Sequence, residues 1–331
     1  MTQAAILGCE GVDLSPDEAA FLAGIDPFGI ILFARNISTP DRLRRLTGDL
    51  RDALGRDVPI LVDQEGGRVQ RLAAPHWRAW QPPLDHVAKS SDPERAIWIR
   101  ARLIAAELHE VGIDVNCIPT ADVAREETHP FLRNRCYGTD PDRVAALGRA
   151  TAQGLLAGGI LPVMKHMPGH GRGRADSHYD LPVIDAPAEA LEEDFAPFRA
   201  LADLPMGMTA HIVVSAFGKH PATQDPALIT LIRERIGFDG LLMSDDLSME
   251  ALGGTLAERT AAAIGAGCDI ALAGHGDRSE KEACAAAAGP MTAEATRRAE
   301  AALSKRTPPE PADLDALEAE LAALMDGPVY A

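Results

Sequence analysis

Short apolar runs alternate along the chain with longer stretches in which apolar and polar residues repeat with a helical period. Eight apolar runs occur, and each is nearly continuous, which is typical of parallel strands that are buried on both faces. The predicted strands cover residues 4–9, 28–33, 58–65, 112–119, 160–167, 206–213, 240–246 and 268–274. Strands and amphipathic helices in strict alternation predict a series of βα units.

The predicted helices begin at recognisable cap residues. Ser15, with Glu18 three residues later and a proline directly after it, predicts a capping box. Thr39, Asp140 and Asp225 each stand before a proline and a helical pattern. The same device at several starts supports a repeated βα unit.

The polar residues at the strand ends distinguish two folds that share this alternation, a (β/α)8 barrel and an open doubly wound sheet. Polar residues close the predicted strands at Asp63, Gln64, Glu65, Asn116, Lys165, His166, His211, Asp245 and Asp246. Only a barrel gathers all these ends on one face. We therefore predict one catalytic TIM-barrel domain over residues 1–331, complete or imperfect, with a C-terminal helix after about residue 308 packed on the outside.

Composition narrows the class of protein. The 331 residues are 46% hydrophobic and carry a formal net charge of −17, which argues against a nucleic-acid partner. No positively charged segment precedes an apolar run near the N-terminus, and no apolar run reaches about 18 residues. The five cysteines are scattered. We expect a cytoplasmic protein without a membrane partner, present as a monomer or weak homodimer.

The glycine-rich pieces match neither a dinucleotide-binding fingerprint nor a P-loop, so we expect no nucleotide cofactor. The stretch KHMPGHGRGRADSHYDLP, residues 165–182, raises a different possibility. His166 and His170 have a spacing that would suit zinc on a helix, but Pro168 and the neighbouring glycines forbid a regular helix. Lys165 also adds a positive charge. We predict no metal, and a zinc-dependent barrel hydrolase remains the alternative.

Two other groups of residues have the chemistry of a glycosidase. Asp245 and Asp246 emerge directly from an apolar strand. A helix cap explains either of them, but a strand-end carboxylate also suits attack on a sugar carbon. Because consecutive strand residues point in opposite directions, we expect one functional aspartate and one structural partner. Asp176 and His178 suit a proton-transferring pair, or else a turn and a solvent-exposed histidine.

Three motifs together resemble a known family. LVDQEGGRVQRL, KHMPGHG followed by DSH and LP, and GLLMSDDLSMEAL occur in this order at the third, fifth and seventh predicted strands. The chain is similar to the β-N-acetylhexosaminidases of glycoside hydrolase family 3, in particular to bacterial single-domain enzymes that recycle peptidoglycan. The resemblance extends from the first predicted strand to the eighth.

The resemblance implies a retaining mechanism in a TIM barrel. The nucleophile it implies is Asp245, and the general acid/base is His178 with Asp176 as its partner. The sugar-binding residues that it implies are Asp63, Arg71, Arg135, Lys165 and His166. For His170 we expect only a role in structuring the loop.

The expected substrate is a small carbohydrate, and no cofactor is expected. The resemblance implies release of terminal β-linked N-acetylglucosamine from muropeptide fragments that carry 1,6-anhydro-N-acetylmuramic acid. Two alternatives use the same pocket. A phosphorylase would transfer the sugar to phosphate, and a sugar-binding protein would have no activity, although the presence of both Asp245 and His178 disfavours the latter.

Overall fold

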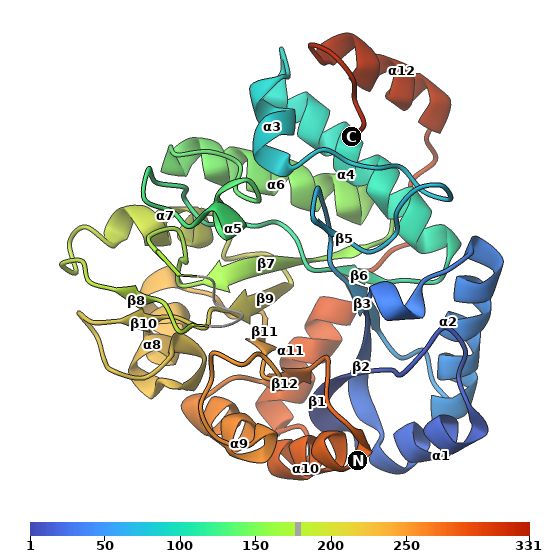
Figure 1. Cartoon of the computed structure of the whole chain (residues 1–331), viewed down its shortest axis with the longest axis vertical. Coiled ribbons are helices and arrows are strands. Elements are labelled where there is room, and N and C mark those ends of the chain that lie inside the picture. Colours follow the sequence, from blue (N-terminus) through green and yellow to red (C-terminus); the bar gives the residue numbers. More distant parts are fainter. Residues whose placement is uncertain (176–179) are drawn as a thin grey trace.

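The computed structural model describes residues 1–175 and 180–331, in which the eight predicted strands form a closed parallel barrel (Figure 1). The barrel strands are β1 (Gln3–Gly8), β2 (Pro27–Leu32), β3 (Ile60–Val62), β6 (Val115–Asn116), β7 (Leu161–Met167), β9 (Met206–Thr209), β11 (Leu241–Asp246) and β12 (Ile270–Ala273). The barrel closes because β1 pairs with β2 on one side and with β12 on the other, where Ala5 lies opposite Ala271. The predicted (β/α)8 barrel is confirmed.

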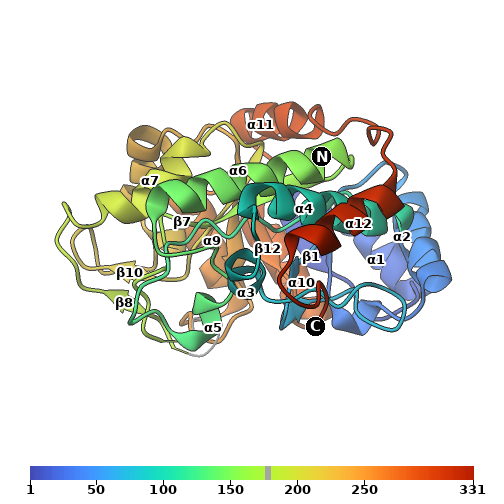
Figure 2. The ribbon, with the colours of Figure 1, turned by 90° about the horizontal axis from the view of Figure 1, so that it is seen from above.

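Helices surround the barrel on its outside (Figures 1 and 2). The α-helices are α1 (Pro16–Ile25), α2 (Pro40–Leu54), α3 (Pro83–Ala88), α4 (Pro93–Glu110), α5 (Pro130–Arg133), α6 (Pro141–Ala157), α7 (Glu192–Ala200), α8 (Pro226–Leu231), α9 (Leu256–Ala266), α10 (Arg278–Ala288), α11 (Ala293–Leu303) and α12 (Leu314–Leu324). Short helical turns occur at η1 (Ala34–Asn36), η2 (Ala222–Gln224) and η3 (Ile232–Ile236). Strand β7 is buried at every residue, as a parallel strand covered on both faces should be.

The cap residues act as predicted, with one exception. The side chains of Thr39, Asp140 and Asp225 each accept a hydrogen bond from a first-turn N–H group of the helix that follows. Ser15 also caps its helix, because its Oγ accepts from the Glu18 N–H at 3.1 Å. The predicted capping box is nevertheless wrong, because the Glu18 carboxylate accepts from the backbone N–H of Glu10 instead, at 2.7 Å.

Several predicted strands are shorter than expected; the run 112–119, for example, forms a barrel strand only at Val115–Asn116. Two of the shortened runs continue outside the barrel. The run 58–65 ends as a barrel strand at residue 62, and its last residues enter a hairpin of β4 (Gln64–Gly66) and β5 (Val69–Gln70). The hairpin bends at Gly66 and Gly67, whose φ angles of 103° and 60° favour glycine. The run 206–213 divides in the same way, since β10 (Val213–Val214) pairs with β8 (Val183–Ile184) outside the barrel. Asp63 therefore lies between a barrel strand and a hairpin.

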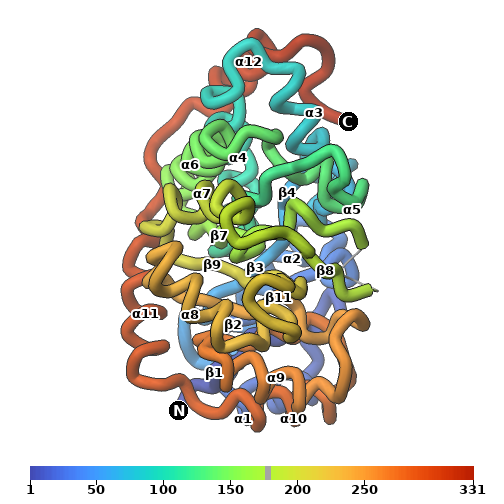
Figure 3. Tube along the Cα trace, turned by 90° about the vertical axis from the view of Figure 1, so that its left-hand side faces the viewer, coloured from blue at the N-terminus to red at the C-terminus, as the bar shows by residue number. Residues whose placement is uncertain are grey.

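The C-terminal helix α12 packs on the outside of the barrel against α4. Arg95 of α4 lies 2.7 Å from Glu320 of α12, and Arg78 lies 2.6 Å from Glu318. Figure 3 shows α12 and the N-terminus at opposite ends of the molecule. None of the helices in residues 1–175 and 180–331 combines the length and the apolar character needed to span a membrane.

Candidate active site

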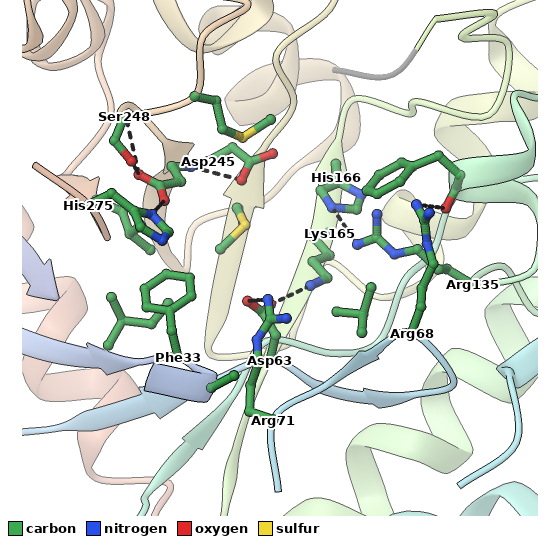
Figure 4. A pocket seen from close by; sticks show the side chains of 18 of the residues that line it. Phe33, Asp63, Arg68, Arg71, Arg135, Lys165, His166, Asp245, Ser248 and His275 are labelled. Carbon is green, nitrogen blue, oxygen red and sulfur yellow. Dashed lines mark hydrogen bonds and ion pairs between the residues drawn. The ribbon is translucent and has the colours of Figure 1, made fainter. Parts of the chain in front are cut away.

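A cavity of about 950 Å³ opens at the carboxyl ends of the barrel strands (Figure 4). Six of the eight predicted site residues line it, namely Asp63, Arg71, Arg135, Lys165, His166 and Asp245. They come from segments between residues 63 and 245, and the barrel brings them together because its parallel strands all end on the same face. The other two predicted site residues, Asp176 and His178, lie outside the described residues.

Lys165 contacts two carboxylates, Asp63 in the floor of the cavity and Glu65 beneath it. Its ammonium nitrogen lies 2.8 Å from Asp63 Oδ1 and 2.6 Å from Glu65 Oε1, and its side chain is only 2% exposed. Arg71 reaches the other oxygen of Asp63 at 3.3 Å. The carboxylate of Asp63 therefore has a cation at each oxygen and is fixed before any ligand binds.

The charges around Asp63 and Lys165 keep both side chains ionised. Burial alone would raise the pKa of Asp63, but the charges of Lys165 and Arg71 hold this pKa well below its ordinary value. Burial alone would lower the pKa of Lys165, but Asp63 and Glu65 raise this pKa above its ordinary value. Both partners therefore carry their charge at neutral pH, so the pair can donate to and accept from sugar hydroxyl groups.

Arg135 makes a two-point contact with Glu65 beneath the cavity. Its Nε lies 2.8 Å from Glu65 Oε2 and its terminal nitrogen lies 2.7 Å from Oε1, and both side chains are buried. Burial raises the pKa of Glu65, but Arg135 and Lys165 outweigh it and lower this pKa to about 2. Glu65 was recognised in the sequence as a strand-end carboxylate without a role. The structure shows that it orients two predicted sugar-binding cations.

His166 lies between an acidic and a basic partner. Its Nδ1 is 2.7 Å from Oδ2 of Asp122, and its Nε2 is 3.4 Å from the terminal nitrogen of Arg135 (Figure 4 labels His166 and Arg135). Sequence reasoning missed Asp122, which is fully buried. In the sequence, Asp122 is the single charged residue of the run 117–124. A charge that is buried with such a run requires a partner, and this is the feature that could have identified Asp122.

His170 contacts the same carboxylate through its backbone, where its N–H donates to Asp122 Oδ1 at 2.6 Å. Its ring packs edge-to-face against His166, with centroids 6.0 Å apart, and neither ring nitrogen has a partner within the described residues. Burial lowers the pKa of His170 to about 4. Within the described part of the chain, no group of three or more histidine, cysteine, aspartate and glutamate side chains is placed to hold a metal ion.

Asp245 and Asp246 both line the cavity, although consecutive strand residues are expected to point in opposite directions. The pairing of β11 with β12 shifts register between Met243 and Asp246, and this shift interrupts the strict alternation of side chains. The two carboxylates nevertheless have different surroundings. Asp246 Oδ1 accepts from Ser248 Oγ at 2.5 Å and from the Gly274 N–H at 3.0 Å, so Asp246 ties two loops together.

Within the described residues, the carboxylate of Asp245 accepts fewer hydrogen bonds than that of Asp246. Asp245 Oδ1 accepts from the neighbouring Asp246 N–H at 2.8 Å. Burial would raise the pKa of Asp245, but His211, His166 and this N–H outweigh burial and lower it. In Figure 4 the labelled Asp245 lies across the cavity from Asp63. An ionised carboxylate at such a position can attack an electrophilic carbon of a ligand that the floor of the cavity holds.

The segments that follow β2 and β12 form a wall of the cavity that the sequence did not predict. The rings of Phe33 and His275 lie 4.5 Å apart, and His275 Nδ1 lies 3.3 Å from Asp246 Oδ2. The guanidinium of Arg35 lies over the same Phe33 ring at 4.8 Å. An aromatic face next to polar groups suits the apolar side of a sugar ring, but nothing local in the sequence connects these residues.

The structure is a TIM barrel whose strand-end cavity holds the ionised carboxylate of Asp245 opposite the ion-paired Asp63 and Lys165. The sequence matches the glycosyl hydrolase family 3 N terminal domain over residues 8–301. A β-hexosaminidase of Bordetella parapertussis is 37% identical over 273 residues, which span 79% of this chain and 77% of that protein.

Solved structures give the same result. The crystal structure of native NagZ from Neisseria gonorrhoeae superposes with a TM-score of 0.87 at 28% identity, covering 98% of both chains. NagZ in complex with N-trifluoroacetyl-D-glucosamine superposes with a TM-score of 0.86 at the same identity and coverage. The chain belongs to glycoside hydrolase family 3 and is a glycoside hydrolase. The resemblance to the β-N-acetylhexosaminidases of this family is confirmed.

Proposed function

We propose that this enzyme removes terminal β-linked N-acetylglucosamine with retention of configuration. The observation that carries the proposal is the placement of Asp245, whose lowered pKa keeps it ionised, across one cavity from the Asp63–Lys165 pair. The β-hexosaminidase relatives and the N-trifluoroacetyl-D-glucosamine complex of NagZ support this choice of sugar. Asp63, Arg71, Arg135, Lys165 and His166 bind the hydroxyl groups of the terminal sugar in this proposal.

The proposed reaction has two steps. In the first, an oxygen of Asp245 forms a bond to the anomeric carbon while the glycosidic bond breaks and His178 gives its proton to the departing oxygen. In the second, His178 takes a proton from water as the water oxygen attacks the same carbon and releases Asp245. Asp176 orients His178 through a hydrogen bond in this proposal. A histidine in place of a second carboxylate avoids like-charge repulsion with Asp245.

The proposed physiological substrate is a muropeptide fragment that carries 1,6-anhydro-N-acetylmuramic acid, in the recycling of peptidoglycan in the cytoplasm. We propose that residues 1–331 act as a single catalytic domain, as a monomer or weak homodimer, without nucleic acid, membrane or cofactor. The cavity of about 950 Å³ supports a substrate larger than one sugar ring, since it is near the upper end of the range for small-ligand pockets.

The test is to trap the covalent intermediate. Incubation with a fluorinated N-acetylglucosaminide that forms a slowly hydrolysed glycosyl-enzyme, followed by peptide mass spectrometry, should place the label on Asp245. A label on another residue would overturn the assignment. Product analysis with and without phosphate separates hydrolysis, which releases free N-acetylglucosamine, from a phosphorylase, which would release the sugar phosphate.

A further inference from the structure

Asp122 connects two histidines of the KHMPGHG motif although it lies more than 40 residues before them. One of its oxygens lies 2.7 Å from His166 Nδ1 and the other accepts from the His170 N–H at 2.6 Å. Its carboxylate is fully buried and lies behind the cavity rather than in its wall. Asp122 therefore does not touch a ligand in the cavity, and any effect on the ligand passes through His166.

We propose that Asp122 is a positioning residue that holds His166 in the Nδ1–H tautomer, with the lone pair of Nε2 directed at Arg135, which lines the cavity. This proposal rests on the proposed function, because it assigns a role within the same site. A carboxylate only accepts hydrogen bonds, so the proton of His166 must be on Nδ1. Arg135 only donates, so its terminal nitrogen at 3.4 Å favours a lone pair on Nε2. The two partners of His166 thus select the same tautomer.

Close packing keeps Asp122 in place. A Cβ atom at Gly171 would lie 1.9 Å from the carbonyl oxygen of Val123, so the segment around Asp122 and the segment after His170 lie in direct contact. Thr128 adds a hydrogen bond from its Oγ1 to the Gly171 carbonyl at 2.5 Å. The two oxygens of Asp122 are therefore committed to two groups whose separation is fixed.

The His170 ring completes the arrangement, because it packs against His166 from the side. Among the described residues, the charged groups that face His166 are Asp122, Arg135 and Asp245, and the neutral ring of His170 adds no further charge. This gives the second histidine of the motif a role in packing. It also gives a physical reason for the contact between the rings of His166 and His170.

The test is Asp122→Asn, which keeps the size of the side chain. The asparagine oxygen can still accept from the His170 N–H, but its NH₂ group then faces His166 Nδ1, so the ring must take the Nε2–H tautomer and direct a donor at Arg135. We expect kcat/KM for an aryl β-N-acetylglucosaminide to fall roughly 10- to 100-fold, as for a misplaced contact group. Nitrogen-15 NMR of histidine-labelled protein should show the change of tautomer at His166.

Two matched measurements separate positioning from general stability. Asp269→Asn changes another buried, ion-paired aspartate at the opposite end of the barrel and should leave kcat/KM within about 2-fold. In a His166→Ala background, Asp122→Asn should have little further effect, because Asp122 acts only through His166. An equal loss in that background, or an Nε2–H tautomer of His166 in the unmodified enzyme, would overturn the proposal.

The NMR result keeps this proposal distinct from the proposed function. If the unmodified enzyme fails to cleave any β-N-acetylglucosaminide, the proposed function is wrong, yet the tautomer of His166 still decides whether Asp122 positions it. If Asp122→Asn fails to fold, the tautomer in the unmodified enzyme remains decisive in the same way.

Discussion

The ammonium group of Lys165 lies 2.8 Å from Asp63 Oδ1, so two groups that are proposed to bind the same sugar also bind each other. The side chain of Lys165 is almost fully buried, and that of Asp63 is 16% exposed. Preorganisation of this kind reduces the side-chain entropy that is lost on binding. It also makes the two residues interdependent, so the effect of removing one includes the cost of an unpaired charge at the other.

Lys165→Met should destabilise the fold as well as weaken binding. The change leaves Asp63 and Glu65 buried with less positive charge, and the loss of one partner from a buried pair costs about 3 kcal/mol or more. Urea unfolding at neutral pH measures this loss. Lys305→Met, at an exposed lysine, is the control and should change the unfolding free energy by less than about 0.5 kcal/mol.

The stability lost in Lys165→Met should also depend on pH, and the pKa shifts predict the direction of this dependence. Lys165 lowers the pKa of Asp63 and of Glu65 in the folded state. Such groups contribute stability that is present above the ordinary carboxyl pKa and is lost as pH falls through the lowered value. The difference between wild type and Lys165→Met should therefore shrink below about pH 4. A difference that stays constant to pH 3 would contradict the ion-pair explanation.

Asp245→Ala should mainly reduce activity, whereas Asp246→Ala should reduce stability. Asp245 makes few structural bonds to the part of the chain that the structure describes, so its removal should leave thermal unfolding almost unchanged. It should lower kcat by roughly four orders of magnitude, as for other nucleophile deletions. Asp246 accepts from Ser248 and Gly274, so its removal should cost about 1–3 kcal/mol of stability. Kinetics with an aryl β-N-acetylglucosaminide and calorimetry of both variants decide the matter. Substantial turnover by Asp245→Ala would contradict the assignment of Asp245 as the nucleophile.

The barrel was predictable because its determinants are local. Continuous apolar runs specify buried parallel strands, and caps such as Thr39 and Asp140 specify where helices begin. The clustering of Asp63 and Lys165 also followed, since each stands at a strand end. The capping box failed because Glu18 has a competing partner in Glu10, which no local pattern reveals.

Other parts of the site depend on contacts between distant segments. Glu65 and Arg135 are 70 residues apart, and Asp122 and His166 are 44 apart. Each pairing depends on loop paths over the carboxyl face of the barrel, which have no periodicity to read. A single charge in an apolar run, as at Asp122, signals only that a partner exists.

His178→Ala should affect substrates according to their leaving groups. An alkyl or sugar leaving group requires a proton as the bond breaks, whereas a nitrophenolate departs without one. We expect a loss of roughly 10²- to 10⁴-fold on a chitobiose-type substrate and a much smaller loss on the nitrophenyl glycoside. The ratio of kcat/KM for the two substrates is the measurement. Equal losses on both would argue against an acid role for His178.

His170→Phe should preserve activity, whereas His170→Ala should reduce it. Neither ring nitrogen of His170 has a partner in the described residues, and its ring packs against His166, so a planar apolar ring can replace it. Alanine would leave a cavity and cost about 2–4 kcal/mol, with a rise in KM as His166 gains freedom. Activity lost equally in both variants would indicate that a nitrogen of His170 is required.

His170→Phe should also change how the stability of the protein depends on pH. Burial lowers the pKa of His170 from 6.5 to about 4, so between these values the unfolded chain binds a proton at this residue that the folded chain does not. Protonation therefore favours unfolding, and stability falls as pH falls through this window. Phenylalanine does not titrate, so His170→Phe should become progressively more stable relative to wild type from pH 6.5 to pH 4. Urea unfolding across this range measures the difference, and parallel stability curves would show that the ring of His170 titrates normally in the folded protein.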